Sequence, residues 1–193
     1  MDINSVSTEL VDMTTMTLRV PAYPIVHVVF YQVVWFAAVL GGASGLWWPA
    51  AVAAGAQLIL HFAVRPDRRQ VALRLLLVAL MGFAIDTALG LLGMCRYVGG
   101  PANGAISPLW MVALWPTFAS LLDDICAWLV PRMGLAVLLG ALGGPLAYFG
   151  GSGFGALSFP NGTAVGLVAV GVTWGVAMIV MVMMWRRQQP VTP

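Results

Sequence analysis

Six long apolar stretches, separated by short breaks, run through most of the chain. A membrane-spanning helix needs about 20 mostly apolar residues, because a rise of about 1.5 Å per residue must cross about 30 Å of hydrocarbon. Backbone groups cannot stay unpaired in lipid, so each stretch is expected to be helical. The pattern therefore predicts six transmembrane helices, over residues 25–42, 46–64, 71–94, 108–130, 134–150 and 163–185.

The breaks contain residues that form turns or start helices. Residues 41–45 are rich in glycine, and residues 65–70 combine a proline with four charges. Ser107 and Pro108 open the fourth stretch as an N-cap residue followed by proline at the first helical position. The uncharged, glycine-rich residues 150–155 are expected to form a loop that lies at the interface or re-enters the bundle.

Composition supports a membrane protein. The chain is 61% hydrophobic and only 8% charged, whereas soluble domains are nearer half apolar and a quarter charged. The predicted fold is an all-α, polytopic bundle over residues 23–187. Residues 1–22 and 188–193 are expected to be cytoplasmic tails. The start of the chain carries three acidic residues and no basic residue before Arg19, unlike a secretory signal.

Arginine placement predicts the orientation. All nine basic residues are arginines, and with both termini in the cytoplasm only Arg96 falls on the outer side. This asymmetry fits the positive-inside rule and favours a multi-pass protein of a bacterial inner membrane. The arginines occupy separate short loops, so no nucleic-acid-binding surface is expected. Five tryptophans near the predicted boundaries are interpreted as an aromatic belt: Trp47, Trp48, Trp110, Trp128 and Trp185.

Small residues are spaced for close helix packing in the fifth stretch, as Gly140-x-x-x-Gly144 and Gly143-x-x-x-Ala147. Lipid offers no hydrophobic reason for helices to associate, so such faces often make the contacts. Packing within the chain is the first interpretation. A homo-oligomer or a membrane-protein partner is the alternative.

Polar side chains in the stretches form two levels. Burying them in lipid is costly, about 2.5–3.5 kcal/mol for Asp at a helix centre, so they are expected to point into the bundle. The inner level lies within about 11 Å of the inner boundary, at about 1.5 Å per residue. It comprises His27, Tyr31, Gln57, His61, Arg74, Asp123 and Asp124.

Two interpretations of the inner level stay open. It is either an ordinary interfacial polar layer or a cytoplasm-facing pocket, in which His27 or His61 acts as general base oriented by a carboxylate. Asp123 and Asp124 would point about 100° apart on a helix, so only one should face a given partner, and Arg74 would neutralise one of them. Two histidines and a carboxylate could also hold a metal ion, but no HxxxH, HxxE or CxxC spacing occurs, so no metal or other cofactor is expected.

The outer level centres on Asp86, about 22 Å from the inner end of its predicted helix at about 1.5 Å per residue. Its neighbours four residues away are Gly82 and Gly90, so it lies on a small-residue face that should pack against another helix. Tyr148 and Thr173 lie at similar depth. Asp86 is either a functional acid or a structural tie to one of those two hydroxyls.

Several sequence motifs, taken together, resemble one family. They are Tyr31-Gln32-x-x-Trp35-Phe36-Ala37, then Asp86, then Pro108-x-Trp110-Met111-x-x-Leu114-Trp115-x-x-Phe118-Ala119, then Gly140-x-x-Gly143-Gly144-Pro145-x-Ala147-Tyr148. The chain resembles, over residues 24–187, the bacterial membrane family catalogued as domain of unknown function 2878. The resemblance implies fold and location but no activity. It draws attention to Asp86, Trp110, Trp115, Pro145 and Tyr148. Its pattern near positions 123 and 124 differs from this chain, which weighs against a catalytic role for the two aspartates.

The leading functional hypothesis is a small binding or transport protein whose ligand is a lipid or another apolar metabolite. Its site is predicted between the third, fourth and fifth helices. The candidate ligand-binding residues are Asp86, Trp110, Trp115, Tyr148 and Thr173. The alternatives are a membrane-embedded enzyme that uses the inner level, and an assembly partner of another membrane protein that has no site of its own.

Overall fold

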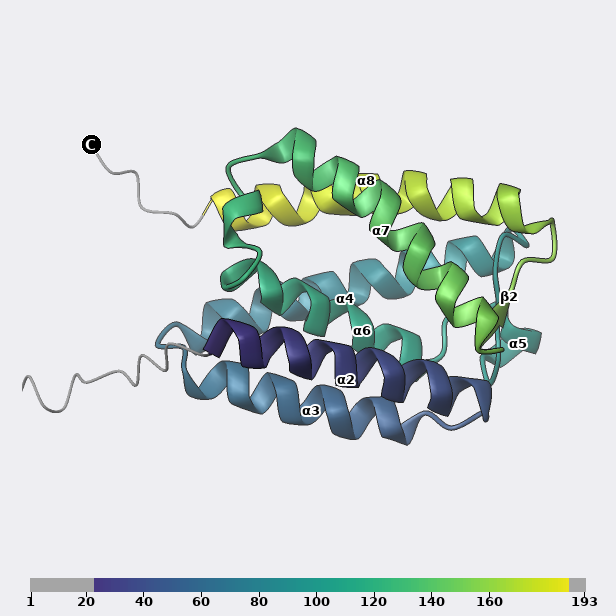
Figure 1. Cartoon of the computed structure of the whole chain (residues 1–193), viewed down its shortest axis with the longest axis horizontal. Coiled ribbons are helices and arrows are strands. Elements are labelled where there is room, and N and C mark those ends of the chain that lie inside the picture. Colours follow the sequence, from purple (N-terminus) through teal and green to yellow (C-terminus); the bar gives the residue numbers. More distant parts are fainter. Residues whose placement is uncertain (1–22, 188–193) are drawn as a thin grey trace, which may run out of the picture.

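The computed structural model describes residues 23–187 and is all-helical apart from one short strand pair. The tails predicted at residues 1–22 and 188–193 lie outside the described residues. The longer helices alternate in direction along the chain (Figure 1). The elements, in chain order, are α2 (Tyr23–Ala43), α3 (Trp48–Ala63), α4 (Arg68–Leu91), β1 (Arg96–Tyr97), α5 (Pro101–Gly104), α6 (Leu109–Ser120), η1 (Leu121–Asp123), η2 (Ala127–Leu129), α7 (Met133–Gly153), β2 (Leu157–Ser158) and α8 (Thr163–Arg186).

Four of the described helices are long and apolar enough to cross a membrane, namely α2, α4, α7 and α8. The other two predicted spans are shorter. α3 has 16 residues, which corresponds to about 24 Å at about 1.5 Å per residue, and α6 has 12. Each of these six helices exposes large apolar side chains that would be costly in water. The most exposed on each helix are Ile25, Ile59, Leu91, Leu109, Leu146 and Val168, all at least 64% exposed.

The fourth predicted span, 108–130, is wrong in its second half. The α-helix ends at Ser120 and is followed by the two short 3-10 turns η1 and η2. Asp124 between them has φ −133° and ψ −100°, far from helical values. Acidic side chains are unfavourable at a helix C-terminus, and here the turns direct both aspartates to buried partners instead. The chain reverses at this point into α7.

The expected loop at residues 150–155 also begins later than predicted. α7 continues to Gly153, and the following turn leads into β2. β2 pairs antiparallel with β1, with Arg96 opposite Ser158 and Tyr97 opposite Leu157. This pair lies at one end of the bundle, which we call the strand end (Figure 1). At the opposite end, the arginine end, α3 and α8 finish and α7 begins, and these element ends carry or adjoin Arg65, Arg186 and Arg132.

The helices form two packed groups. In one group α6 contacts α2, α3 and α4, and α2 packs along α3. In the other group α7 packs along α8, which also contacts α4 (Figure 1). A Cβ on Gly140 or Gly144 would collide with Met178 or Trp174 of α8. These two glycines therefore bring α7 and α8 together within the chain, as the first interpretation predicted. Gly143 is different, because a Cβ there would meet nothing within 4 Å.

Candidate functional site

A cavity of about 450 Å³ lies between the two packed groups. α2, α6 and α7 supply most of its walls, and Trp174 and Met178 of α8 complete them. Aromatic and aliphatic side chains dominate, with Tyr31, Gln32 and Tyr148 as polar exceptions. The volume falls within the range of about 300–1,000 Å³ that is typical of small-molecule sites.

The cavity is long and opens on the apolar side of the bundle. Its lining along α7 extends from Leu139 to Gly151, or about 18 Å at about 1.5 Å per residue. Gln32, Phe36 and Leu139 line it and are also exposed on the surface. An apolar molecule could therefore enter sideways from the bilayer without crossing an aqueous phase.

Asp86 lies behind the wall of this cavity. The side chain is fully buried, and its two oxygens accept hydrogen bonds from the Tyr148 hydroxyl and, at 2.8 Å, from Trp115 Nε1. Both donor residues line the cavity, whereas Asp86 does not. The carboxyl therefore fixes the orientation of two wall residues that come from α6 and α7.

Trp115 is held on both faces of its ring. It stacks on Trp174 with ring centroids 4.5 Å apart and planes 15° from parallel. On the side of α4, a Cβ at Gly82 would overlap the indole, so only glycine leaves room for the ring. Trp110, another wall residue, donates from Nε1 to the carbonyl of Val98 at 3.0 Å. The described wall is thus rigid where α6 forms it.

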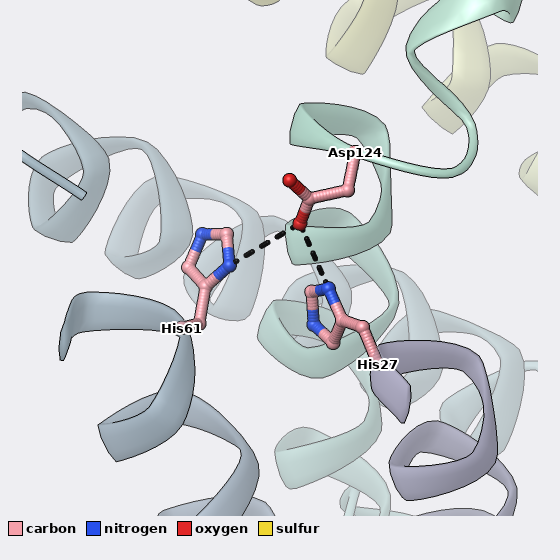
Figure 2. A group of neighbouring side chains, drawn as sticks. All are labelled: His27, His61 and Asp124. Atoms are coloured by element: carbon pink, nitrogen blue, oxygen red, sulfur yellow. Dashed lines mark hydrogen bonds and ion pairs between the residues drawn. The ribbon is translucent and has the colours of Figure 1, made fainter. Parts of the chain in front are cut away.

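A second group of polar residues lies at the arginine end. Figure 2 shows His27 of α2 and His61 of α3 converging on Asp124. His27 Nδ1 is 2.8 Å, and His61 Nδ1 3.6 Å, from the same oxygen, Asp124 Oδ2. His61 Nε2 is 3.1 Å from Asp123 Oδ2. The two histidine rings lie 5.1 Å apart between centroids.

Each aspartate uses its other oxygen for an arginine. Arg65 pairs with Asp124 Oδ1. Arg74 Nη2 lies 3.3 Å from Asp123 Oδ1, which also accepts from Trp185 Nε1 at 2.7 Å. Burial raises the pKa of Asp124, but hydrogen bonds to His27 and His61 and the charge of Arg65 outweigh it and hold this pKa below its usual range. Asp124 is therefore a carboxylate at neutral pH.

Hydrogen bonds from Gln57 and to Ser120 also hold the other side of this group of polar residues. His27 Nε2 lies 2.9 Å from Ser120 Oγ. Gln57 donates from Nε2 to the same oxygen at 3.2 Å and to the carbonyl of Thr117 at 3.1 Å. The Ser120 hydroxyl itself donates to the carbonyl of Thr117 at 2.7 Å. These polar groups are thus largely buried, hydrogen-bonded and drawn from α2, α3, α4, α6, η1 and α8.

The chain matches, over residues 24–180, the profile of a family described as "Protein of unknown function (DUF2878)". The chain belongs to this family. No curated protein and no solved structure gives a significant match to it. The residues that carried the resemblance include much of the cavity wall of this DUF2878 protein, such as Tyr31, Trp35, Trp110 and Tyr148. The family description gives no activity, so membership leaves the function open.

The outer candidate residues predicted for the DUF2878 protein differ in whether they line the cavity. Trp110, Trp115 and Tyr148 line the cavity, and Asp86 supports it from behind. Thr173 does neither, because its hydroxyl donates to the carbonyls of Ala169 and Val170 in its own helix. Of the third, fourth and fifth helices, between which the site was predicted, only the fourth and fifth (α6 and α7) line the cavity. The first helix supplies one wall, and α4 contributes no lining residue.

The predicted inner candidates of the DUF2878 protein mostly converge. His27, Gln57, His61, Arg74, Asp123 and Asp124 form one network, which we call the inner cluster. Tyr31 departs from it and lines the cavity, with its ring 6.0 Å from Phe118. The expectation that only one aspartate faces a given partner is wrong, because His61 lies within 3.6 Å of both. The turn after Ser120 removes the helical spacing on which that expectation depended.

Sequence reasoning missed Ser120, Arg65 and Trp185 as members of the inner cluster. Ser120 precedes Asp124 by four residues, a signal that was present. Trp185 was assigned to the aromatic belt, but it is buried and bonds to Asp123, and Trp110 is buried too. The absence of metal-ligand spacing within single helices is also uninformative here, because His27, His61 and Asp124 come from three different elements.

Proposed function

We propose that this chain is a six-span protein of a bacterial inner membrane, with both termini in the cytoplasm. Four helices are long enough to span unaided. α3 and α6 also expose large apolar side chains, and the flanking turns extend their length. The arginines of the described residues lie mostly at the arginine end, and Arg96 lies at the strand end. This distribution supports a cytoplasmic arginine end.

Single cysteines test this topology. In a background with Cys95 and Cys126 replaced by alanine, we expect Ser44→Cys to react with a membrane-impermeant maleimide on intact spheroplasts. Arg69→Cys should react only after permeabilisation. Both side chains are exposed, so burial does not explain a difference between them. Equal labelling of the two from outside would contradict the six-span arrangement.

We further propose that the cavity binds an apolar ligand, a lipid chain or a similarly apolar metabolite, for sequestration or transport. The observation that carries this is a long aromatic and aliphatic cavity of about 450 Å³, part of whose lining, such as Phe36 and Leu139, is exposed on the surface. Its length, about 18 Å at about 1.5 Å per residue of α7, is comparable to half of an about 30 Å hydrocarbon core. One acyl chain therefore fits the cavity in extent and in chemistry.

One polar group inside the cavity favours a ligand that also carries an acceptor. Trp174 lines the cavity, and its Nε1–H is buried without an acceptor among the described residues. Buried donors usually have partners. An ester or carboxyl oxygen of the ligand would supply one. The assembly-partner alternative gains no support from Gly140 and Gly144, because α8 covers both.

Filling the cavity from Gly143 tests ligand binding. A side chain at this helical position meets open space and lines the cavity, so Gly143→Leu should fold normally. We expect it to reduce photocrosslinking of a diazirine-bearing palmitate to α2 and α6 peptides by at least about tenfold, the loss that about 1.4 kcal/mol of binding free energy produces.

Gly55→Leu is the matched control. Gly55 is also helical, also faces open space and does not line the cavity. It should leave crosslinking unchanged, as read by peptide mass spectrometry. If the probe labels exposed side chains such as Ile59 as strongly as the cavity wall, and Gly143→Leu changes nothing, the cavity does not bind it.

A membrane-embedded enzyme is a second candidate, favoured by the inner cluster. The requirement that the imidazoles and carboxylates lie within hydrogen-bond reach is met for His27 with Asp124 and for His61 with Asp123. A general base must exchange protons near working pH. Nitrogen NMR of the two imidazoles measures this directly, and signals that stay constant between pH 5 and pH 9 would rule out proton transfer by either ring.

A further inference from the structure

We propose that the inner cluster binds one divalent transition-metal ion, with Nδ1 of His27, Nδ1 of His61 and Oδ2 of Asp124 as its protein ligands. This inference goes beyond ligand binding in the cavity and does not depend on it. One ligand atom from each of the three residues lies within 4.8 Å of the other two. The side chains come from α2, α3 and the turn after η1, and Figure 2 shows them pointing at a common centre.

The two Asp124–histidine distances are close to those of a coordinated ion. The Asp124 oxygen is 2.8 Å from one Nδ1 and 3.6 Å from the other. In a tetrahedral zinc site with bonds of about 2.0–2.1 Å, ligand atoms are separated by about 3.3 Å. Shifts of a few tenths of an ångström therefore bring both Asp124–histidine separations to the value that an ion requires.

The Nε2 atoms of His27 and His61, which are not the proposed ligand atoms, already have hydrogen-bond acceptors. A carboxylate only accepts, so His61 Nε2 donates its hydrogen to Asp123 Oδ2 at 3.1 Å. Ser120 gives its own hydrogen to the carbonyl of Thr117, so its oxygen accepts from His27 Nε2 at 2.9 Å. Metal-binding histidines usually donate their other N–H to such a partner, which fixes the tautomer and the ring orientation.

This arrangement directs the two Nδ1 atoms at one anionic oxygen. A neutral imidazole that donates from Nε2 carries a lone pair on Nδ1, and a lone pair facing a carboxylate is repulsive. Positive charge must therefore lie between them, either as protons on the rings or as one shared cation. One cation at the centre would serve all three ligand atoms at once, because these atoms lie within 4.8 Å of one another.

The residues around the site leave Asp124 Oδ2 available to an ion and leave a route by which an ion can enter. Arg65 pairs with Asp124 Oδ1 and leaves Oδ2 to face the histidines. A cavity of about 190 Å³, lined by Arg74, Asp123 and the exposed Gln70 among others, adjoins the cluster at the arginine end. Two imidazoles and a carboxylate suit zinc or ferrous iron better than calcium or magnesium. Three protein ligands also leave a position for water or substrate.

The chain contains two histidines, so a tag without histidine makes every imidazole signal report on this site. We expect the purified full-length protein, stripped with a chelator, to take up one equivalent of Zn²⁺. Cobalt should bind in its place with the visible spectrum of a low-coordinate Co²⁺ site. His61→Gln and Asp124→Asn should weaken Zn²⁺ affinity more than about 100-fold, since loss of an outer-shell partner alone costs about 10–100-fold.

Asp67→Asn is the matched control. Asp67 is an exposed carboxylate at the same end, 3.7 Å from Arg74, and its loss should leave Zn²⁺ affinity within about threefold. Zn²⁺ should also shift the Nδ1 resonances of both imidazoles in the wild-type protein, so the result does not depend on the variants folding. The proposal is overturned if folded wild-type protein takes up no metal, if Zn²⁺ leaves both Nδ1 resonances unchanged, or if Asp124→Asn and Asp67→Asn bind equally.

Discussion

Asp86→Leu is expected to destabilise the protein by about 2–4 kcal/mol, because it leaves two buried donors without an acceptor, at about 1–2 kcal/mol each. The donors are the Tyr148 hydroxyl and Trp115 Nε1, both fixed on this one carboxyl. Neither donor can reach water, since both residues are buried. The measurement is the free energy of unfolding in mixed detergent and SDS micelles.

Asp86→Asn is the isosteric control. Its amide oxygen still accepts from Trp115, and the Tyr148 hydroxyl can reverse and accept from the amide nitrogen. We therefore expect a cost below about 1 kcal/mol, smaller than that of an unpaired buried donor. If the asparagine variant unfolds as easily as the leucine variant, the role of Asp86 depends on its acidity and not on hydrogen bonding.

Tyr148→Phe separates the two hydrogen bonds. In the wild-type background the loss of the hydroxyl should cost about 1 kcal/mol, and in the Asp86→Leu background it should cost close to nothing or even stabilise, because an unsatisfied donor is removed. Additive effects would show that the two side chains do not interact. The same variants should loosen the cavity wall, because both donor rings line it.

The helices were predictable because the hydrocarbon of a membrane restricts which backbone structures can cross it. Every backbone group must be paired inside hydrocarbon, so an apolar run of sufficient length becomes a helix whatever its neighbours. The same constraint predicted that Asp86 points into the bundle, since an acid in lipid needs a partner, but it left the choice between Tyr148 and Thr173 open. α2, α7 and α8 accordingly begin and end within about three residues of the predicted bounds, within the usual scatter of such boundaries.

The positions of the cavity and the inner cluster were not predictable in full. Trp35 and Phe36 have the same transfer energy whether they face lipid or a cavity, so hydropathy alone cannot assign α2 to a site. Asp124 reaches both histidines because the helix ends at Ser120, and no residue in the sequence forces that end. Trp185 belongs to the cluster through a contact with Asp123, 62 residues earlier, which sequence spacing does not reveal.

Arg74→Met should be the most destabilising of the substitutions considered, at about 3–5 kcal/mol, the cost of removing one partner of a buried ion pair. Asp123 and Arg74 have side chains only 7% and 9% exposed, and Nη2 lies 3.3 Å from Oδ1. The guanidinium also lies over the Trp185 ring, 4.8 Å from its centroid. Arg65, at the same end of the bundle, is already paired with Asp124. The measurement is again the free energy of unfolding in SDS-containing micelles.

The free-energy cost of Arg74→Met should depend on whether Asp123 keeps its charge. Asp123→Asn added to Arg74→Met should recover at least about 1–2 kcal/mol, because the amide carries no charge and still accepts from Trp185. Arg74→Lys should fall between wild type and Arg74→Met, since it keeps the charge but loses the planar contact with the indole. If Arg74→Met costs less than about 1 kcal/mol, the value typical of exposed pairs, Asp123 is solvated and the inner cluster is an open interfacial layer. A large cost together with recovery in the double variant would instead establish a desolvated site, in which each carboxylate is held by an arginine on one oxygen and faces a histidine with the other.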